Sequence, residues 1–202
     1  VVRTIVDAGG SAEAVVTDVT QEEAVGILFD RAFAAAKGRE RPDLVVYNAG
    51  NNRRMNFLNV TAAEFEAFWR IGCFGGFLVG REAMRRLLPL ERGTVIFTGA
   101  SGSMRGKAGY AQFAAAKAGL RMLSQSMARE FGPKGIHVAH VVVDGGINGD
   151  RLRASQPTRV AEQGETGLLD IDAIAQAYWF LHEQHPSAWT QEIDLRPFKE
   201  PF

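Results

Sequence analysis

The sequence has almost no cysteine: Cys73 is the only one among 202 residues, so an internal disulfide framework is excluded. An excess of charge is also lacking, because 23 Lys and Arg side chains balance 23 Asp and Glu side chains. This balance argues against a nucleic acid or an anionic membrane surface as the main partner. The longest apolar runs, such as Val141–Val143, are far too short to span a bilayer. With no signal-type segment at the start, we expect a cytoplasmic protein with neither a membrane nor a nucleic-acid partner.

What the sequence does have is an alternation of strand-length apolar runs with segments of helical periodicity. Hydrophobic residues make up 46% of the chain, enough for one sizeable core in a single domain over residues 1–202. Strands are predicted at Ala14–Val19, Leu44–Asn48, Gly93–Thr98, His137–Val143 and Gln191–Leu195. Helices are predicted at Gln21–Lys37, Ala62–Leu88, Gly109–Phe131 and Asp172–Gln184. This order is typical of an α/β fold, a doubly wound parallel sheet with helices on both faces.

Local signals set several boundaries. Thr61 and Glu64 have the spacing of a capping box at the start of the second helix. Gly132-Pro133 is expected to end the third helix. Residues 148–169 are rich in Gly, Pro, Ser and charges and follow the carboxyl end of a strand, where doubly wound sheets bind ligands. We interpret them as a mobile lid.

A glycine-rich phosphate loop is missing. A G-x-G-x-x-G turn binds a pyrophosphate because its glycines let backbone amides close on the anion at a helix N-terminus. Among the 22 glycines, no two are separated by a single residue. The nearest substitute, Thr98–Gly102, follows a strand, but the next predicted helix begins only near Gly109. Val1–Ala8 has the pattern of a helix end and Gly9-Gly10 of its stop, so the chain is predicted to begin in the middle of a domain.

Residues Val46-Tyr47-Asn48-Ala49-Gly50 form a hydrophobic strand that ends in Asn-Ala-Gly. This motif resembles the short-chain dehydrogenase/reductase family. Further matches follow in order: Asp18 within Thr17–Thr20, the run Ala128–Val138, and Gly145. The resemblance covers nearly all of the chain and implies a Rossmann-like sheet that is N-terminally incomplete, without the family's first two strands and its cofactor loop.

The resemblance implies NAD or NADP as the cofactor. The residues expected at the cofactor are Asp18, Asn48, Ala49, Gly50, Lys117, Gly145 and Ile147. In the family, the aspartate contacts adenine and the Ala-Gly backbone passes near the adenosine ribose. For Asp18 and Asn48 the alternative is that strand-end polar residues simply cap turns. Without the phosphate loop, cofactor binding by this chain is expected to be weak.

The family's catalytic residues are mostly replaced. Its members use a Tyr to transfer the proton, a Lys four residues later, a Ser that orients the substrate and an Asn that anchors a water chain. Lys117 matches the Lys, but counting back places Phe113 at the Tyr, Ala100 at the Ser and Gly72 at the Asn. A phenylalanine has no proton to give, so the usual general acid–base step is lost at that position.

Three neighbours are candidate replacements. Ser101 follows the serine position, Tyr110 lies two helical turns before Lys117 if the helix begins early enough, and Asp144 lies beside the nicotinamide end. Each has a structural alternative: Ser101 as a turn residue, Tyr110 as an aromatic at the start of a helix, and Asp144 as a cap of the turn that follows it. Two functions therefore stay open: an oxidoreductase of small carbonyls or alcohols with a degenerate site, or a non-catalytic ligand-binding or scaffold relative.

The remaining polar and aromatic groups point to structure. His137 and His140 lie three apart on one strand, hence on opposite faces, and are expected to be buried and hydrogen-bonded. No Cys, His and Asp cluster has metal spacing, and His182 and His185 are expected at the surface. Arg105 is interpreted as a solvated loop residue or a contact for an acidic substrate. The aromatic series from Phe65 to Phe77, with Gly72, Gly75 and Gly76, favours either core burial or the seam of a homodimer or homotetramer.

Overall fold

The computed structural model describes residues 1–34, 41–164 and 166–200. Within these residues, four parallel strands form one sheet in the order β1 (Leu44–Tyr47), β2 (Gly93–Thr98), β3 (Ile136–Val143) and β4 (Glu192–Leu195). Leu44 lies beside Thr94, and Thr94 lies beside His137. The predicted parallel pairing of these three neighbouring strands is confirmed.

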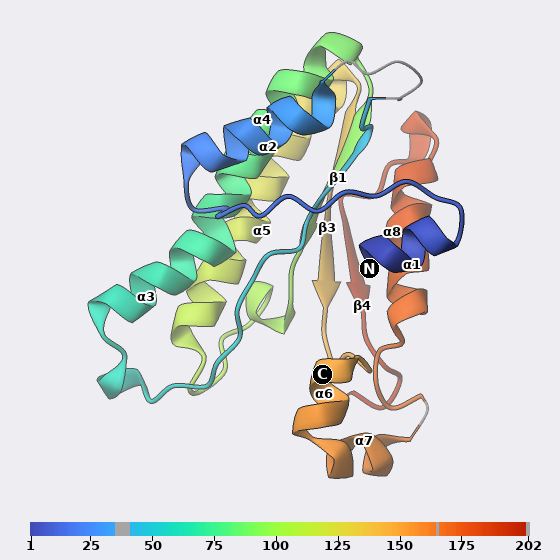
Figure 1. Ribbon diagram of the computed structural model, residues 1–202. Coiled ribbons are helices and arrows are strands. Elements are labelled where there is room, and N and C mark those ends of the chain that lie inside the picture. Colours follow the sequence, from blue (N-terminus) through green and yellow to red (C-terminus); the bar gives the residue numbers. More distant parts are fainter. Residues whose placement is uncertain (35–40, 165, 201–202) are drawn as a thin grey trace.

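Helices cover both faces of the sheet. Figure 1 shows α2 (Glu22–Phe33), α4 (Gly75–Leu87) and α5 (Ala111–Phe131) on one face and α8 (Ile171–Glu183) on the other. The other helices are α1 (Val2–Asp7), α3 (Ala62–Trp69), α6 (Asp150–Ser155) and α7 (Pro157–Gln163). Single turns occur at η1 (Phe57–Asn59), η2 (Arg70–Phe74), η3 (Leu88–Leu90), η4 (Ser101–Ser103), η5 (Gly132–Lys134) and η6 (Pro186–Ala188). Among the described helices, none combines the length and apolar character that a membrane crossing requires.

The core has two parts because side chains on a strand alternate between the faces of the sheet. Val95 and Phe97 of β2 pack with Leu120 of α5 in the larger cluster, under α2, α4 and α5. Ile96, between them in sequence, packs in the smaller cluster with Leu181 of α8. All five side chains are fully buried, so this arrangement fixes α5 and α8 on opposite faces.

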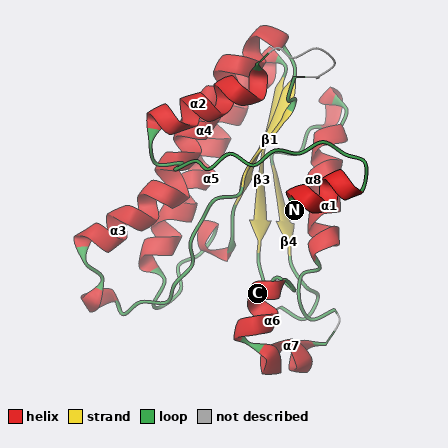
Figure 2. Cartoon of the chain, in the orientation of Figure 1, coloured by secondary structure: helices red, strands yellow, loops and turns green. Residues whose placement is uncertain are grey.

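The predicted strand Ala14–Val19 is wrong. Figure 2 draws this segment as a loop, Val16 is fully exposed, and only Val19 packs against the core. A strand needs a neighbour to satisfy its backbone N–H and C=O groups, and no described strand lies beside this one. The following helix begins at Glu22 rather than Gln21, and the predicted end at Lys37 lies outside the described residues.

The predicted helix Ala62–Leu88 contains a π-helical turn, η2, between α3 and α4. Its start is the predicted capping box: the Glu64 amide donates to Thr61 Oγ1 at 3.2 Å, and the Thr61 amide donates to Glu64 Oε2 at 3.1 Å. In η2 the Ile71 carbonyl accepts a hydrogen bond from the Tyr47 hydroxyl on β1. The π turn is therefore tied directly to the sheet.

Gly72, Gly75 and Gly76 allow close packing within the chain rather than against a partner subunit. A Cβ at Gly72 would lie 2.7 Å from the Ala116 Cβ, and one at Gly76 would overlap the Leu120 side chain; both partners belong to α5. Gly75 similarly faces the Tyr47 hydroxyl of β1. The close helix approach predicted from these glycines is present, but it joins the π turn and α4 to α5 and to the sheet.

Residues 148–169 contain two short helices, α6 and α7, where an irregular segment was predicted. Ile147 and Leu169 form an isolated bridge that closes the segment at its base. In Figure 1 the segment lies beyond the carboxyl ends of β3 and β4. Its position therefore agrees with the expectation, while its motion as a lid stays a prediction.

Candidate active site

Lys117 lies in the interior between α5 and the carboxyl end of β2. The side chain is 6% exposed, and its ammonium donates to the Thr98 carbonyl at 2.7 Å. Burial lowers the pKa of Lys117 to about 8. A Cβ at Gly50 would lie 3.4 Å from Lys117 Nζ, so the ammonium reaches the Asn48–Gly50 segment that follows β1. The structure thus brings Lys117 and Gly50 together, as the resemblance implies.

The turn after β2 carries the positions of the missing catalytic groups. Ala100 precedes η4, and Ser101 begins it half-buried, with its carbonyl accepting from the amides of Met104 and Arg105. The Phe113 ring lies against Gly102, where a Cβ would be 2.8 Å from the ring. An apolar ring therefore occupies the position at which the family places a phenol.

Tyr110 lies before α5 rather than on it. The helix begins at Ala111, because Gly109 adopts a positive φ of 83° and the chain turns there. The Tyr110 ring meets Phe113 edge-on, with ring centroids 6.5 Å apart. The two-turn spacing that would put Tyr110 on the helical face of Lys117 therefore does not apply.

Asp144 is the most strongly held of the candidate groups. It is 2% exposed, and its Oδ2 lies 2.8 Å from Arg105 Nη2 and 2.9 Å from Arg196 Nη2. Arg105 is a loop residue with a 45% exposed side chain, as one of its two interpretations expected, and it also forms an ion pair with Asp144. The pair links the end of β3 to the loop after η4, and the carboxylate is engaged by two guanidinium groups.

The residues expected at the cofactor lie along the carboxyl edge of the sheet. Asn48 and Gly50 are exposed after β1, and Ile147 is 43% exposed beyond β3. Gly145 has a φ of 151°, and a Cβ there would lie 2.6 Å from Pro197, so this turn requires glycine. Asp18 accepts from the Thr20 amide and hydroxyl, which lowers the pKa of Asp18. That contact matches the turn-capping alternative.

These residues fit one end of a nicotinamide dinucleotide better than the other. A buried ammonium beside an exposed glycine, Lys117 with Gly50, suits a ribose hydroxyl. No glycine-rich backbone nest for a pyrophosphate is present in residues 1–34, 41–164 and 166–200. The described part of the chain therefore holds groups for the nicotinamide side and lacks the phosphate cradle.

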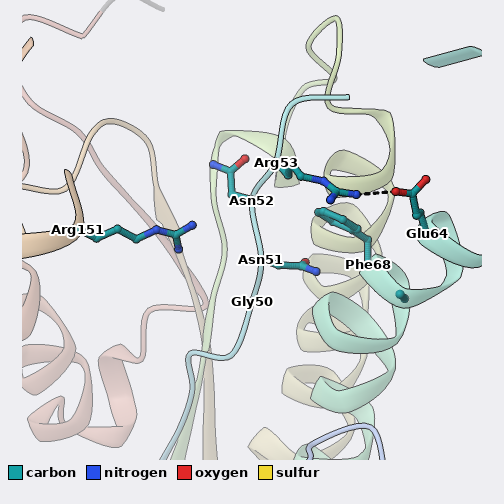
Figure 3. Close-up of a pocket in the computed structure, with 8 residues that line it drawn as sticks. Gly50, Asn51, Asn52, Arg53, Glu64, Phe68 and Arg151 are labelled. Carbon is teal, nitrogen blue, oxygen red and sulfur yellow. Dashed lines mark hydrogen bonds and ion pairs between the residues drawn. The ribbon is translucent and has the colours of Figure 1, made fainter. Parts of the chain in front are cut away.

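A cavity of about 420 Å³ opens beside this edge. It lies between the loop after β1 and α3, and Figure 3 shows Arg151 of α6 pointing toward Asn52 from the opposite side. Arg53 donates to Glu64 Oε1 at 2.7 Å and lies over the Phe68 ring. The sequence analysis did not predict this cavity. The polar run Asn51-Asn52-Arg53-Arg54, directly after a strand end, is the sequence feature that could have indicated it.

The described residues contain no group of three or more His, Cys, Asp or Glu placed to hold a metal ion. His137 and His140 are both buried and hydrogen-bonded, as predicted. His182 corrects the expectation of a surface residue: it is half-buried and its Nδ1 lies 3.0 Å from Thr94 Oγ1. His185 is exposed, as expected.

Comparison with known sequences gives consistent matches. A family profile described as Enoyl-(Acyl carrier protein) reductase matches residues 1–193. The 3-oxoacyl-[acyl-carrier-protein] reductase MabA of Mycobacterium avium is 33% identical over 155 residues, covering 76% of this chain and 57% of MabA. The reductase FabG of Salmonella typhimurium is 33% identical over 154 residues, covering 74% of this chain and 63% of FabG. The chain thus spans less than two thirds of the length of either relative.

Comparison with solved structures shows the same fold over nearly the whole chain. A short-chain dehydrogenase from Rhodopseudomonas palustris has a TM-score of 0.79 and 37% identity, covering 98% of this chain and 80% of the other. A metagenomic short-chain oxidoreductase in complex with NADP has a TM-score of 0.79 and 23% identity, covering 97% and 78%. The second match supports the fold alone.

Proposed function

Because the chain belongs to the short-chain dehydrogenase/reductase family, we propose that it is part of an NAD(P)-dependent oxidoreductase that acts on a small carbonyl or alcohol with a rearranged site. The observation that carries this proposal is Lys117, a buried ammonium beside Gly50 and the turn after β2. A buried ammonium is costly to keep even with the Thr98 carbonyl as its acceptor, and a hydrogen bond to a ribose hydroxyl would give it a function.

In this proposal each residue of the chain has a limited task. Bound nicotinamide dinucleotide supplies the hydride chemistry. Lys117 holds the ribose and adds positive charge beside the reacting oxygen, while Ser101, Tyr110 and Asp144 are the candidates for moving its proton. A proton on Asp144 would neutralise the carboxylate that both arginines contact, so it would weaken two ion pairs.

Turnover by this chain is expected to be weak or absent. Each charge-assisted hydrogen bond of a phosphate loop contributes roughly 1.5–3 kcal/mol, so losing two or three weakens cofactor binding about a thousandfold or more. Losing the Tyr removes a further factor of roughly 10²–10⁴ in rate. Both losses follow from residues that are replaced or missing within this chain.

A non-catalytic, ligand-binding relative is the second candidate. Two observations favour it: the Phe113 ring fills the position of the phenol, and Asp144 is held in two ion pairs. In that case the cavity between Asn52 and Arg151 binds a ligand that is not converted.

We also propose self-association through α3, α4 and α5. The aromatic side chains Phe65, Trp69 and Phe77 are 39–40% exposed, and Met122 of α5 is 51% exposed. Apolar groups exposed together on neighbouring helices are typical of a subunit interface. Sedimentation that shows a monomer at every concentration would refute this.

The test follows nicotinamide absorbance with a panel of ketones and alcohols. The chain is compared with Lys117→Ala, with Asp144→Asn, and with a Phe113→Tyr, Ala100→Ser double variant. Weak turnover that the double variant raises at least tenfold and Lys117→Ala abolishes supports the oxidoreductase. Cofactor binding without turnover in any variant supports the non-catalytic relative. Strong turnover that Asp144→Asn abolishes would show that Asp144 is the relocated catalyst.

A further inference from the structure

The cavity of about 420 Å³ beside the loop after β1 has one firmly fixed wall. The Gln112 side chain of α5 is 1% exposed, and its Nε2 donates to the Arg53 carbonyl at 2.7 Å. Further along the loop, the Met55 amide donates to the Gly109 carbonyl at 2.8 Å. These two hydrogen bonds tie the loop to the start of α5 and so fix the backbone that carries the two asparagines of the cavity.

At the α3 end of the cavity the charges are already paired. The Thr61 amide and hydroxyl donate to Glu64 Oε2 at 3.1 and 3.0 Å, and Arg53 donates to Glu64 Oε1 at 2.7 Å. These hydrogen bonds lower the pKa of Glu64, so its carboxylate is ionised. Arg53 also lies over the Phe68 ring, 5.9 Å from its centroid. The charge of Arg53 is therefore offset by that of Glu64.

The opposite end of the cavity has a positive charge without a counter-ion. Arg151 of α6 is exposed, and its guanidinium has no hydrogen-bond or ion-pair partner within the described residues. In the same part of the chain, the carboxamides of Asn51 and Asn52 have no partner either. Figure 3 shows the guanidinium directed toward Asn52. Three polar groups of the lining are thus available to a ligand that enters from solvent.

A further positive charge lies behind Gly50, which also lines the cavity. A Cβ at Gly50 would lie 3.4 Å from Lys117 Nζ, so the backbone there separates the ammonium from the cavity. The ammonium donates to a neutral group, the Thr98 carbonyl, which does not offset its charge. Positive charges of the lining and of Lys117 therefore exceed the single negative charge of Glu64. A hollow with this excess attracts small anions.

We propose that this cavity binds a small monocarboxylate that also carries a hydroxyl or carbonyl group. The carboxylate pairs with the guanidinium of Arg151, because the planar fork of a guanidinium matches two carboxylate oxygens. The carboxamides of Asn51 and Asn52 both donate and accept hydrogen bonds, which suits a hydroxyl or a carbonyl. Phe68 offers an apolar surface to the carbon skeleton. The volume lies near the lower end of the range of about 300–1,000 Å³ that is typical of small-molecule sites.

Glu64 restricts the charge of the ligand. Figure 3 shows its carboxylate on the side of the cavity opposite to Arg151, so it repels a second carboxylate on a ligand that Arg151 holds. A phosphate group carries more charge than one guanidinium neutralises. The described ranges 1–34, 41–164 and 166–200 offer no glycine-rich backbone nest to make up the difference. The site therefore favours a single carboxylate over a dicarboxylate or a phosphate.

The bound acid has a different role under each proposed function. In the oxidoreductase it is the substrate, and this assignment rests on the proposed function. In the non-catalytic relative it is bound and released unchanged. The binding site itself depends on neither, because the contacts with Arg151 and the two asparagines require no nicotinamide and no turnover.

Binding is measured by titrating the chain with lactate and following the backbone amide signals of Gly50, Asn52 and Ala67 by NMR. Lactamide is the neutral analogue, and malonate is a dianion with the same number of carbon atoms. Lactate should bind about tenfold more tightly than either compound, which corresponds to about 1.4 kcal/mol. Lactamide or malonate that binds as tightly as lactate, or lactate that leaves these signals unchanged, would overturn the proposal.

Variants of the lining test the assigned contacts. Arg151→Ala should weaken lactate binding about tenfold. Arg153→Ala is the matched control, because Arg153 lies on the same helix but donates to Asn148 instead, and it should change the affinity less than about twofold. Glu64→Gln keeps a residue that supports the capping box and should remove the preference for lactate over malonate. Equal effects of the two arginine variants, or a preference that Glu64→Gln leaves intact, would contradict the site.

An oxidation assay separates this inference from the proposed function. Lactate oxidation that Arg151→Ala slows through a higher KM, while Arg153→Ala does not, supports both. Lactate that binds as expected, in a chain that oxidises neither lactate nor any neutral alcohol, supports the site and refutes the oxidoreductase. Turnover of neutral alcohols by a chain that does not bind lactate supports the oxidoreductase and overturns the site.

Discussion

The buried ammonium of Lys117 should make stability rise with pH. Burial lowers the pKa of this side chain from 10.5 to about 8. Between these values the unfolded chain still holds the proton that the folded chain has released. Unfolding then takes up a proton, so the free energy of unfolding rises with pH between about 8 and 10.5, and the contribution of Lys117 is constant below about 8. Since one pKa unit corresponds to about 1.4 kcal/mol, raising the pH from about 7.5 to about 9 should add about 1 kcal/mol through this group.

Urea unfolding of the chain and of Lys117→Met across this range measures the effect. The variant has no ammonium to bury, so the difference in unfolding free energy between the two proteins should shift by about 1 kcal/mol in favour of the unaltered chain. Burial also raises the pKa of Cys73, but this contribution is common to both proteins and cancels. Lys134→Met, at an exposed position, is the matched control and should give a curve parallel to that of the unaltered chain. Parallel curves for Lys117→Met would refute the reasoning.

Three further predictions concern packing, capping and charge, all measured by urea unfolding. Gly76→Ala should lower the free energy of unfolding by about 1–3 kcal/mol, because the added Cβ would overlap a leucine of α5. Gly26→Ala has open space around the added Cβ and should stabilise α2 by about 0.5–1 kcal/mol. Equal unfolding midpoints for the two variants would contradict this. Thr61→Ala should cost about 1 kcal/mol through the lost capping box, and an unchanged midpoint would count against that cap. Asp144→Asn should lower the free energy of unfolding by about 2–3 kcal/mol, because it leaves two arginines without their buried carboxylate. Asp194 is 41% exposed, so Asp194→Asn should lower it by less than about 1 kcal/mol. A larger loss for Asp194→Asn than for Asp144→Asn would be inconsistent with burial as the cause.

Periodicity along the sequence predicted the strands that the sheet contains, from Leu44–Tyr47 to Glu192–Leu195. It failed at Ala14–Val19, where the apolar alternation is present but no described strand lies beside it. A strand is completed by hydrogen bonds to a neighbour, and a pattern of side chains does not reveal whether that neighbour exists. Within the long second helix, the sequence predicted the cap at Thr61 but not the π turn at Arg70–Phe74, which the sheet completes through Tyr47.

The site shows the same division. Spacing along the chain placed Lys117 and revealed Phe113, because the family motif lies within one short stretch of sequence. The ion pairs of Asp144 and the hydrogen bonds from Ser103 through His140 to Glu192 join residues that are far apart in sequence. The sequence alone determined what is local: helical periodicity, a capping box, the spacing of a motif and the phenylalanine in it. The tertiary structure alone decided which charges and hydrogen-bonding groups meet, because adjacent parallel strands bring their carboxyl ends to one edge whatever the length of chain between them.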